Sequence, residues 1–310
     1  MKNIIISFIS ILSALLLCTS CSAQMSGDKA TTVEASEIVK RIKNGKPVNY
    51  TNVHIVGAID LTQIANKNST SAYINCEITL DGCVFEDDFS AFTSSNNQLI
   101  YSIFMRNISF RNCTFLKNVS FRQAQCAFRL DFENCHVKGE SDFCAISVNG
   151  ASFSGCTFDD NALFVSSTFN QRSSFATTKF IQGANFQYCH FNNIVSFTDT
   201  HFGGYTDFSN AHASALCDFT NAQFGARVVM LNATYLGQLK LAKCVFFDNL
   251  SITQCRMLSG LNLTNAKVNK LFELSDNIFG SVPDLTTLVK GEKCHCEMIN
   301  NKSLQQINLQ

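Results

Sequence analysis

Large apolar side chains recur along the middle of the chain at alternating intervals of five and six residues. In the stretch ANFQYCHFNNIVSFTDTHFGGYTDF, residues 184–208, these side chains are Phe186, Phe191, Phe197, Phe202 and Phe208. An amphipathic helix would space its apolar residues by three and four, and a half-buried strand would alternate with period two. Two consecutive intervals make an internal repeat of 11 residues. The pattern therefore predicts many short, similar units.

The aromatic positions form a column that we expect to fill the core. The alternating spacing begins at Phe110, is one residue short before Phe153, and then continues to Phe279. After Phe224 most of its positions hold Met, Tyr, Leu, Ile or Val. The phenylalanines of the regular part of this column are Phe153, Phe158, Phe164, Phe169, Phe175, Phe180, Phe186, Phe191, Phe197, Phe202, Phe208, Phe219 and Phe224.

A second column, of small residues, stands two positions before the large one and holds mostly Ala, Thr, Ser and Cys. Residues two apart on a strand point to the same side, so each unit directs one small and one large side chain inward. Fifteen cysteines in an exported chain would ordinarily suggest disulfides. We instead expect the cysteines of this column to act as small buried groups. The column includes Cys113, Cys135, Cys156, Cys189, Cys244 and Cys255.

An 11-residue period is also typical of right-handed coiled coils. That interpretation fails here, because a helical seam needs apolar spacings of three and four. The repeat is also rich in Phe, Thr, Ser, Asn and Gly, which favour strands and turns over helices. Short strands separated by corners and stacked as a solenoid satisfy both columns.

Individual units resemble pentapeptide repeats: small, polar, Leu or Phe, then two polar residues. The matching units include ANFQY at 184–188, CDFTN at 217–221 and AQFGA at 222–226. The five-plus-six spacing is similar to a Phe-rich variant of that family. The resemblance implies an all-β fold, a right-handed quadrilateral β-helix, with four units in each coil and an additional residue at every second corner.

A short helix is predicted over residues 32–43, ahead of the first strand. Thr31 and Glu34 fit a capping box, and Asn44–Gly45 followed by Pro47 fits a helix stop. Its position predicts a lid over the open end of the solenoid.

The only two prolines, Pro47 and Pro283, lie at the two ends of the repeat. Proline cannot donate a hydrogen bond to a strand ladder, so stacked coils are expected to exclude it. The predicted parts are a signal peptide at 1–20, a tether and capping helix at 21–49, the β-helix at 50–282, and a C-terminal cap or tail at 283–310.

The amino terminus, MKNIIISFISILSALLLCTSCSAQ, is typical of an export signal. Lys2 supplies the positive charge, and residues 4–17 supply an apolar stretch of signal-peptide length. The small residues before Cys21 resemble a bacterial lipobox, which implies lipidation of Cys21, for instance with palmitate, and anchoring as an outer-membrane lipoprotein facing the periplasm or the surface. Signal-peptidase cleavage after Ala23 and an uncleaved anchor are the alternatives.

Candidate chemical groups are few, and no catalytic, metal or cofactor site is expected. The acidic runs Glu86–Asp88 and Asp159–Asp160 have no predicted carboxylate opposite them, as a glycosidase would require. Cys294–His295–Cys296 offers at most three ligands and lacks a second pair at zinc spacing. The 11-residue spacing of His190, His201 and His212 places them on alternating faces.

The sequence leaves three candidate functions. The first is a non-catalytic, envelope-tethered structural or binding module whose partner is a protein or glycan. The second is a carbohydrate-active β-helix enzyme, whose site would have to lie near the insertion at 86–109 or at the termini. The third follows from the resemblance, because some pentapeptide-repeat proteins mimic duplex DNA and protect a topoisomerase. Lys plus Arg equals Asp plus Glu at 24 each, so an acidic DNA mimic and a basic nucleic-acid binder are both disfavoured.

Overall fold

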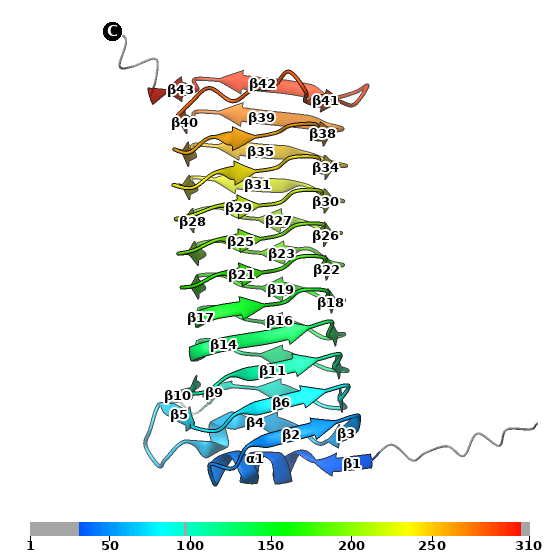
Figure 1. Cartoon of the computed structure of the whole chain (residues 1–310), viewed down its shortest axis with the longest axis vertical. Coiled ribbons are helices and arrows are strands. Elements are labelled where there is room, and N and C mark those ends of the chain that lie inside the picture. Colours follow the sequence, from blue (N-terminus) through cyan, green and yellow to red (C-terminus); the bar gives the residue numbers. More distant parts are fainter. Residues whose placement is uncertain (1–30, 96–97, 305–310) are drawn as a thin grey trace, which may run out of the picture. The chain divides into compact units, whose positions relative to one another are not determined.

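The computed structural model describes residues 31–95 and 98–304, and these form a four-sided β-solenoid (Figure 1). The chain divides into two units, Met1–Ala30 and Thr31–Gln310, and the first lies outside the described residues. Each coil stacks in parallel on the one before it, so that Thr157 pairs with Lys179 and Lys179 with His201, each 22 residues on. The predicted all-β fold with a short N-terminal helix is confirmed.

Two of the four sides are separate sheets. Sheet A consists of β1 (Thr31–Glu34), β3 (Val53–Val56), β7 (Val84–Phe85), β12 (Thr114–Phe115), β15 (His136–Val137), β18 (Thr157–Phe158), β22 (Lys179–Phe180), β26 (His201–Phe202), β30 (Gln223–Phe224), β34 (Val245–Phe246), β38 (Lys267–Val268) and β41 (Val289–Lys290). Sheet C consists of β4 (Ile59–Asp60), β8 (Phe89–Ser90), β13 (Val119–Ser120), β16 (Ser141–Asp142), β19 (Ala162–Leu163), β23 (Ala184–Asn185), β27 (Thr206–Asp207), β31 (Val228–Leu231), β35 (Leu250–Thr253), β39 (Leu271–Ser275) and β42 (His295–Ile299).

The other two sides are joined by β14 (Gln125–Glu133) and β17 (Ser147–Ser152), which turn a corner and pair on both. The side before sheet A, here called side B1, also holds β2 (Val48–Thr51), β6 (Ile78–Asp81), β11 (Ile108–Arg111), β21 (Ser173–Ser174), β25 (Val195–Ser196), β29 (Cys217–Asp218), β33 (Leu239–Lys240) and β37 (Leu261–Asn262). The side after sheet C, here called side B2, also holds β5 (Ser71–Ile74), β10 (Gln98–Phe104), β20 (Thr168–Phe169), β24 (His190–Phe191), β28 (His212–Ala213), β32 (Thr234–Tyr235), β36 (Arg256–Met257), β40 (Ile278–Phe279) and β43 (Lys302–Ser303).

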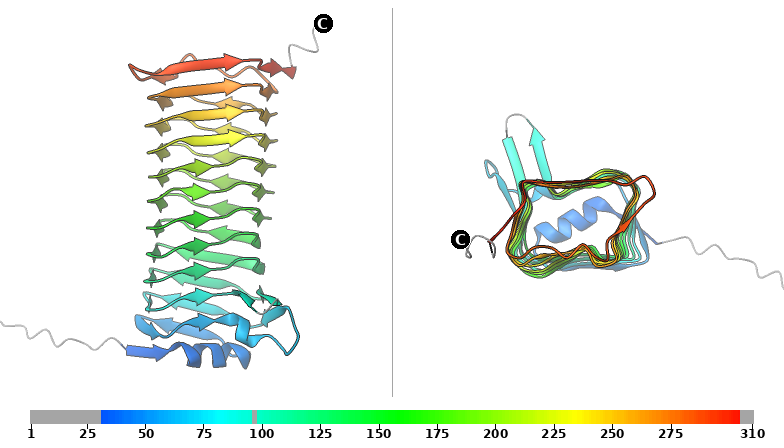
Figure 2. Two further views of the ribbon diagram at one scale, coloured as in Figure 1. Left: turned by 180° about the vertical axis from the view of Figure 1, so that it is seen from behind. Right: turned by 90° about the horizontal axis from the view of Figure 1, so that it is seen from above.

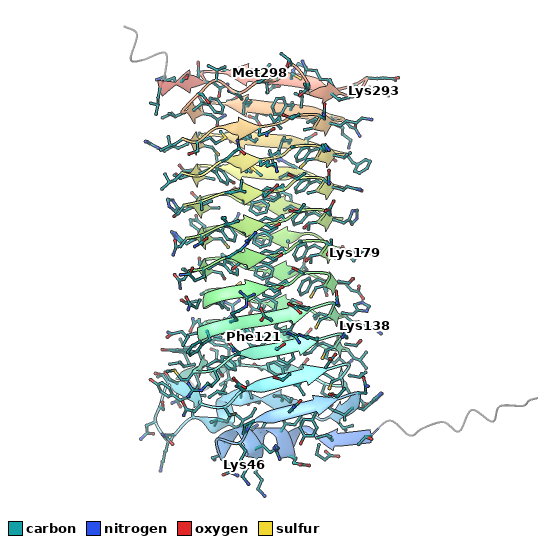
Figure 3. The ribbon with its side chains drawn as sticks, viewed as in Figure 1. Lys46, Phe121, Lys138, Lys179, Lys293 and Met298 are labelled. Carbon is teal, nitrogen blue, oxygen red and sulfur yellow. The ribbon has the colours of Figure 1, made fainter. Side chains whose placement is uncertain are left out.

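Aromatic rings fill the inside of the solenoid (Figure 3). All thirteen phenylalanines of the regular column are at most 1% exposed. Rings on the same side of successive coils stack, as Phe186 does on Phe164 and Phe208 at 4.8 and 4.9 Å between centroids. Rings on opposite sides meet edge to face across the interior, as Phe186 on sheet C does with Phe175 and Phe197 on side B1. Both arrangements are favourable for aromatic pairs, so each ring is held from several directions.

The corners are of two alternating kinds. Within each five-residue interval the chain makes a four-residue turn: the carbonyl of Phe164 accepts the N–H of Ser167 at 3.2 Å, and Ser166 has φ of 60°. A positive φ at the third position defines a type II turn. The six-residue intervals place the additional residue in a wider bend. Every second corner therefore imposes a left-handed backbone on whichever residue occupies it.

Thr177 stands at such a left-handed position, with φ of 58°, and its exposed side chain is branched at Cβ. This backbone region is strained for branched residues and better tolerated by Asn. We expect Thr177→Asn to raise the free energy of unfolding by about 1 kcal/mol, measured by urea denaturation followed by circular dichroism. The reverse exchange, Asn221→Thr, two coils further in the same column, is the control and should lower stability by at least as much. Equal stabilities for all three proteins would contradict the prediction.

The N-terminal end is closed by α1 (Ala35–Lys43), which lies across the cross-section of the solenoid (Figure 2, right). Ala35, Ile38 and Ile42 are buried in the same core as the first coils. The predicted stop at Asn44–Gly45 is confirmed, but the predicted capping box is wrong. Thr31 and Glu34 belong to β1, which pairs with β3, and Glu34 precedes the helix without a side-chain cap. Strand pairing with a later segment thus takes the residues that local capping would have used.

One more coil follows Pro283. Strands β41, β42 and β43 pair with β38, β39 and β40 and extend the sheets beyond it. The C-terminal segment is therefore a cap built as a last coil, and its far side has no described strand above it. Leu271 of β39 pairs with His295 of β42, so this coil is two residues longer than a regular coil.

Candidate functional site

The clearest departure from the regular coil is a hairpin on the second coil. Strand β9 (Phe92–Ser95) pairs antiparallel with the first half of β10, while the second half of β10 pairs in parallel with β5 and β14. The hairpin projects sideways from the outline of the solenoid (Figure 2, right). The sequence showed it only as a polar interruption near Ser90–Ser102, within the 86–109 insertion.

A groove of about 440 Å³ lies on side B2 next to the base of this hairpin. Ile103 and Met105 supply apolar surface, while Gln125, Asn149 and Asn170 supply amide groups. None of the side chains that line the groove is charged. Because it combines hydrogen-bonding amides with apolar surface, the groove suits a neutral polar ligand or a polypeptide more than an ion.

Exposed aromatic residues lie close to this groove in the sheet register. Tyr73, on β5, is paired with Ile103 and is 56% exposed. Phe128, on β14, is 47% exposed, whereas the phenylalanines of the core column are fully buried. We refer to the hairpin, the groove, Tyr73 and Phe128 together as the hairpin surface. This surface departs from the polar exterior of the regular coils.

The inward cysteines are hydrogen-bond donors as well as small buried groups. The thiols of Cys156, Cys189 and Cys244 each donate to the carbonyl of a phenylalanine on the preceding coil, at 3.2, 2.9 and 2.9 Å. The hydroxyl groups of Thr178 and Thr200 make the same contact at 2.7 Å. Cys, Thr and Ser can replace one another at these positions of the column, because each is small and can donate a hydrogen bond to the carbonyl group. Sequence reasoning recognised their size but missed the hydrogen bond, although the mixture of Thr and Ser with Cys was a signal for it.

Burial keeps these thiols protonated. It raises the pKa of Cys255 to about 11, and it raises the pKa of Cys189 and Cys244 as well. A buried thiol of raised pKa is neither a good nucleophile nor an accessible metal ligand. The inward cysteines are therefore structural.

The two acidic runs are built into corners. Glu86 contacts Nδ1 of His54 at 3.1 Å, and Asp88 accepts the N–H of Asn118 at 3.0 Å from the next coil. Asp159 contacts Nε2 of His136 at 2.7 Å, and Asp160 accepts the N–H of Asn161. These contacts give the carboxylates structural partners, which weighs against an acid–base pair for sugar cleavage.

The three histidines are divided between two sides, as their spacing predicted. His190 and His212 face each other on β24 and β28, with ring centroids 5.9 Å apart, while His201 lies on β26 of sheet A. Within residues 31–95 and 98–304, no three His, Cys, Asp or Glu side chains are grouped so as to hold a metal ion.

Cys294 and Cys296 differ from all other cysteines of the described chain. Both are partly exposed, whereas the other eleven are buried. Their sulfur atoms are 4.0 Å apart. Burial and the neighbouring thiol of Cys296 raise the pKa of Cys294.

The amino-terminal segment, with Cys21, lies outside the described residues. In the part of the chain that the structure describes, no helix combines the length and hydropathy needed to cross a bilayer.

The family model for pentapeptide repeats (9 copies) matches three overlapping segments, residues 164–212, 175–223 and 186–234. A comparison with curated proteins found no significant match. The matched residues belong to the most regular coils, where each step is five or six residues. This part of the solenoid therefore carries pentapeptide repeats, and the fold agrees with the β-helix that such repeats imply.

Proposed function

We propose that this chain is a non-catalytic structural module of a bacterial cell envelope, tethered to the outer membrane by a lipid on Cys21, that presents a rigid β-helix surface to a protein or glycan. A pentapeptide-repeat β-solenoid fits a structural role, and the export-like amino terminus motivates the envelope location. The observation that carries the proposal is the unbroken hydrophobic core, which runs from the N-terminal helix to the last coils.

The core has a direct consequence for function. With every coil filled by side chains, the interior has no room for a substrate, so recognition must take place on the outside. Most of the outside is a repetitive polar surface, on which Lys138 and Lys179 point away from the solenoid (Figure 3). The hairpin surface is different because it combines exposed aromatic rings with an uncharged groove. We propose that the partner contacts the hairpin surface.

The tether can be tested by labelling bacteria that produce the full-length chain with radioactive palmitate. The wild-type protein should incorporate label and sediment with the outer membrane, whereas Cys21→Ser should lose the label and leave the membrane fraction. Cys18→Ser is the matched control, since it removes the neighbouring thiol and should keep both properties. Protease treatment of intact cells then separates surface display from a periplasmic orientation.

Equal labelling of Cys21→Ser and wild type would contradict the lipid anchor. Recovery of the wild-type protein in the soluble cytoplasm would reject the envelope assignment altogether.

A further inference from the structure

Cys294 and Cys296 lie where the regular architecture ends. Cys294 follows a turn in which its N–H donates to the carbonyl of Gly291 at 2.9 Å, and Cys296 is the second residue of β42. Strand β42 pairs with β39 on one side, and no described strand covers its other side. The segment lies between Lys293 and Met298, which are labelled at the C-terminal end of the solenoid in Figure 3.

This position leaves the two side chains room that the inward cysteines lack. Residues two apart on an extended strand point to the same side, and the sulfur atoms of this pair are 4.0 Å apart. A disulfide needs a sulfur–sulfur distance of about 2.05 Å. Rotation about the side-chain bonds has to close the remaining distance, and the side without a neighbouring strand provides space for that rotation.

The cysteines that directly precede β12, β15 and β18 make an instructive contrast. Cys113, Cys135 and Cys156 also lie close together on successive coils, but they are at most 1% exposed. Their thiols donate to carbonyl oxygens of the preceding coil. A disulfide among them would break these hydrogen bonds inside a packed core, and no oxidant could reach them without unfolding.

We propose that Cys294 and Cys296 form a redox-active thiol pair that is oxidised by thiol–disulfide exchange. In the first step the thiolate of one cysteine attacks a small-molecule or protein disulfide, forming a mixed disulfide and releasing one thiolate, which takes up a proton. In the second step the thiolate of the other cysteine attacks the cysteine sulfur of the mixed disulfide and releases the second thiol. The net reaction converts two protein thiols and one disulfide into a protein disulfide and two thiols.

The proposed pair would make the last coil sensitive to its redox environment. Oxidation joins the turn before β42 to the strand itself, at the end of the solenoid where both cysteines pack against the hydrophobic core. The inference stands on the exposure, distance and terminal position of the two sulfur atoms and does not depend on lipidation.

The test uses purified, fully reduced full-length protein incubated at neutral pH with oxidised glutathione. Native protein is then treated with N-ethylmaleimide, and each cysteine-containing peptide is quantified by mass spectrometry. We expect labelling of the peptide that contains Cys294 and Cys296 to fall roughly tenfold, and this peptide to lose the mass of two hydrogen atoms. Peptides with inward cysteines should stay unlabelled with or without the oxidant.

Two single variants establish the mechanism. In Cys294→Ser and in Cys296→Ser the remaining thiol cannot be resolved, so each variant should accumulate the mixed disulfide with glutathione. The serine changes are small, and circular dichroism spectra that match the wild type exclude unfolding as the cause. The proposal would be overturned if the wild type keeps the mixed disulfide, if both thiols remain fully reactive, or if the new bond maps to other cysteines.

Discussion

Replacing Phe186 with alanine is expected to lower the free energy of unfolding by about 3–5 kcal/mol. The ring stacks on Phe164 and Phe208 and meets Phe175 and Phe197 edge to face, and none of it is exposed. Alanine would leave a cavity that the stacked backbone cannot close, because the hydrogen-bond ladders hold the coils at a fixed spacing. Urea denaturation followed by circular dichroism measures the effect, and the absence of tryptophan makes circular dichroism the natural probe.

Phe247→Ala is the matched control for this prediction. The chemical change is the same, but Phe247 is 48% exposed and comes directly after the buried Phe246. Its replacement should change stability by no more than about 0.5 kcal/mol. Similar losses for the two variants would mean that burial in the aromatic column is not the dominant stabilising contribution.

The sequence was sufficient to predict the fold because the repeat places nearly the same requirement on every coil. Phe186 and Phe208 occupy equivalent positions 22 residues apart, and once one side chain is assigned to the interior, the others follow by the period. The absence of proline from the repeat and the excess of phenylalanine follow from the same requirement, because every coil needs a hydrogen-bonded ladder and a large inward side chain. A pattern of this kind is local and regular, which is the case that sequence reasoning handles best.

Features that depend on contacts between distant segments were not predictable in this way. Thr31 and Glu34 fit a capping box in the sequence, yet they form a strand because β3, about 20 residues later, offers a partner edge. The last coil after Pro283 lacks the five-and-six rhythm and appears only through its pairing with β38, β39 and β40.

The hairpin surface was even less accessible to sequence analysis. Tyr73, Ile103 and Gln125 are brought into one row by pairing across coils of unequal length. The sequence shows the additional residues of these coils but not how β10 divides its pairing between β9 and the solenoid. The candidate binding surface therefore emerged from the structure, while the region that contains it could be named beforehand.

The buried cysteines predict that this protein unfolds at moderately alkaline pH. Burial is the main cause of a raised pKa at seven thiols, those of Cys76, Cys126, Cys144, Cys189, Cys217, Cys244 and Cys255. In the unfolded chain a thiol ionises near pH 8.5, whereas in the folded chain these thiols remain protonated. Their stabilising contribution is thus complete below about pH 8.5 and declines as the pH rises toward the folded values.

The decline should be steep, because each such thiol lowers the free energy of unfolding by about 1.4 kcal/mol per pH unit. Seven thiols together lower it by roughly 10 kcal/mol per pH unit. A domain stabilised by about 5–15 kcal/mol would unfold within about one to two pH units above the onset. Replacing Cys189 and Cys244 with threonine removes two of these thiols and retains the donor, since Thr178 and Thr200 make the same hydrogen bond elsewhere in the column. We expect the double variant to unfold at a higher pH, with a slope smaller by about 3 kcal/mol per pH unit, in pH titrations with a reductant present. If the double variant and the wild type unfold at the same pH, ionisation of the buried thiols is not what opens the solenoid.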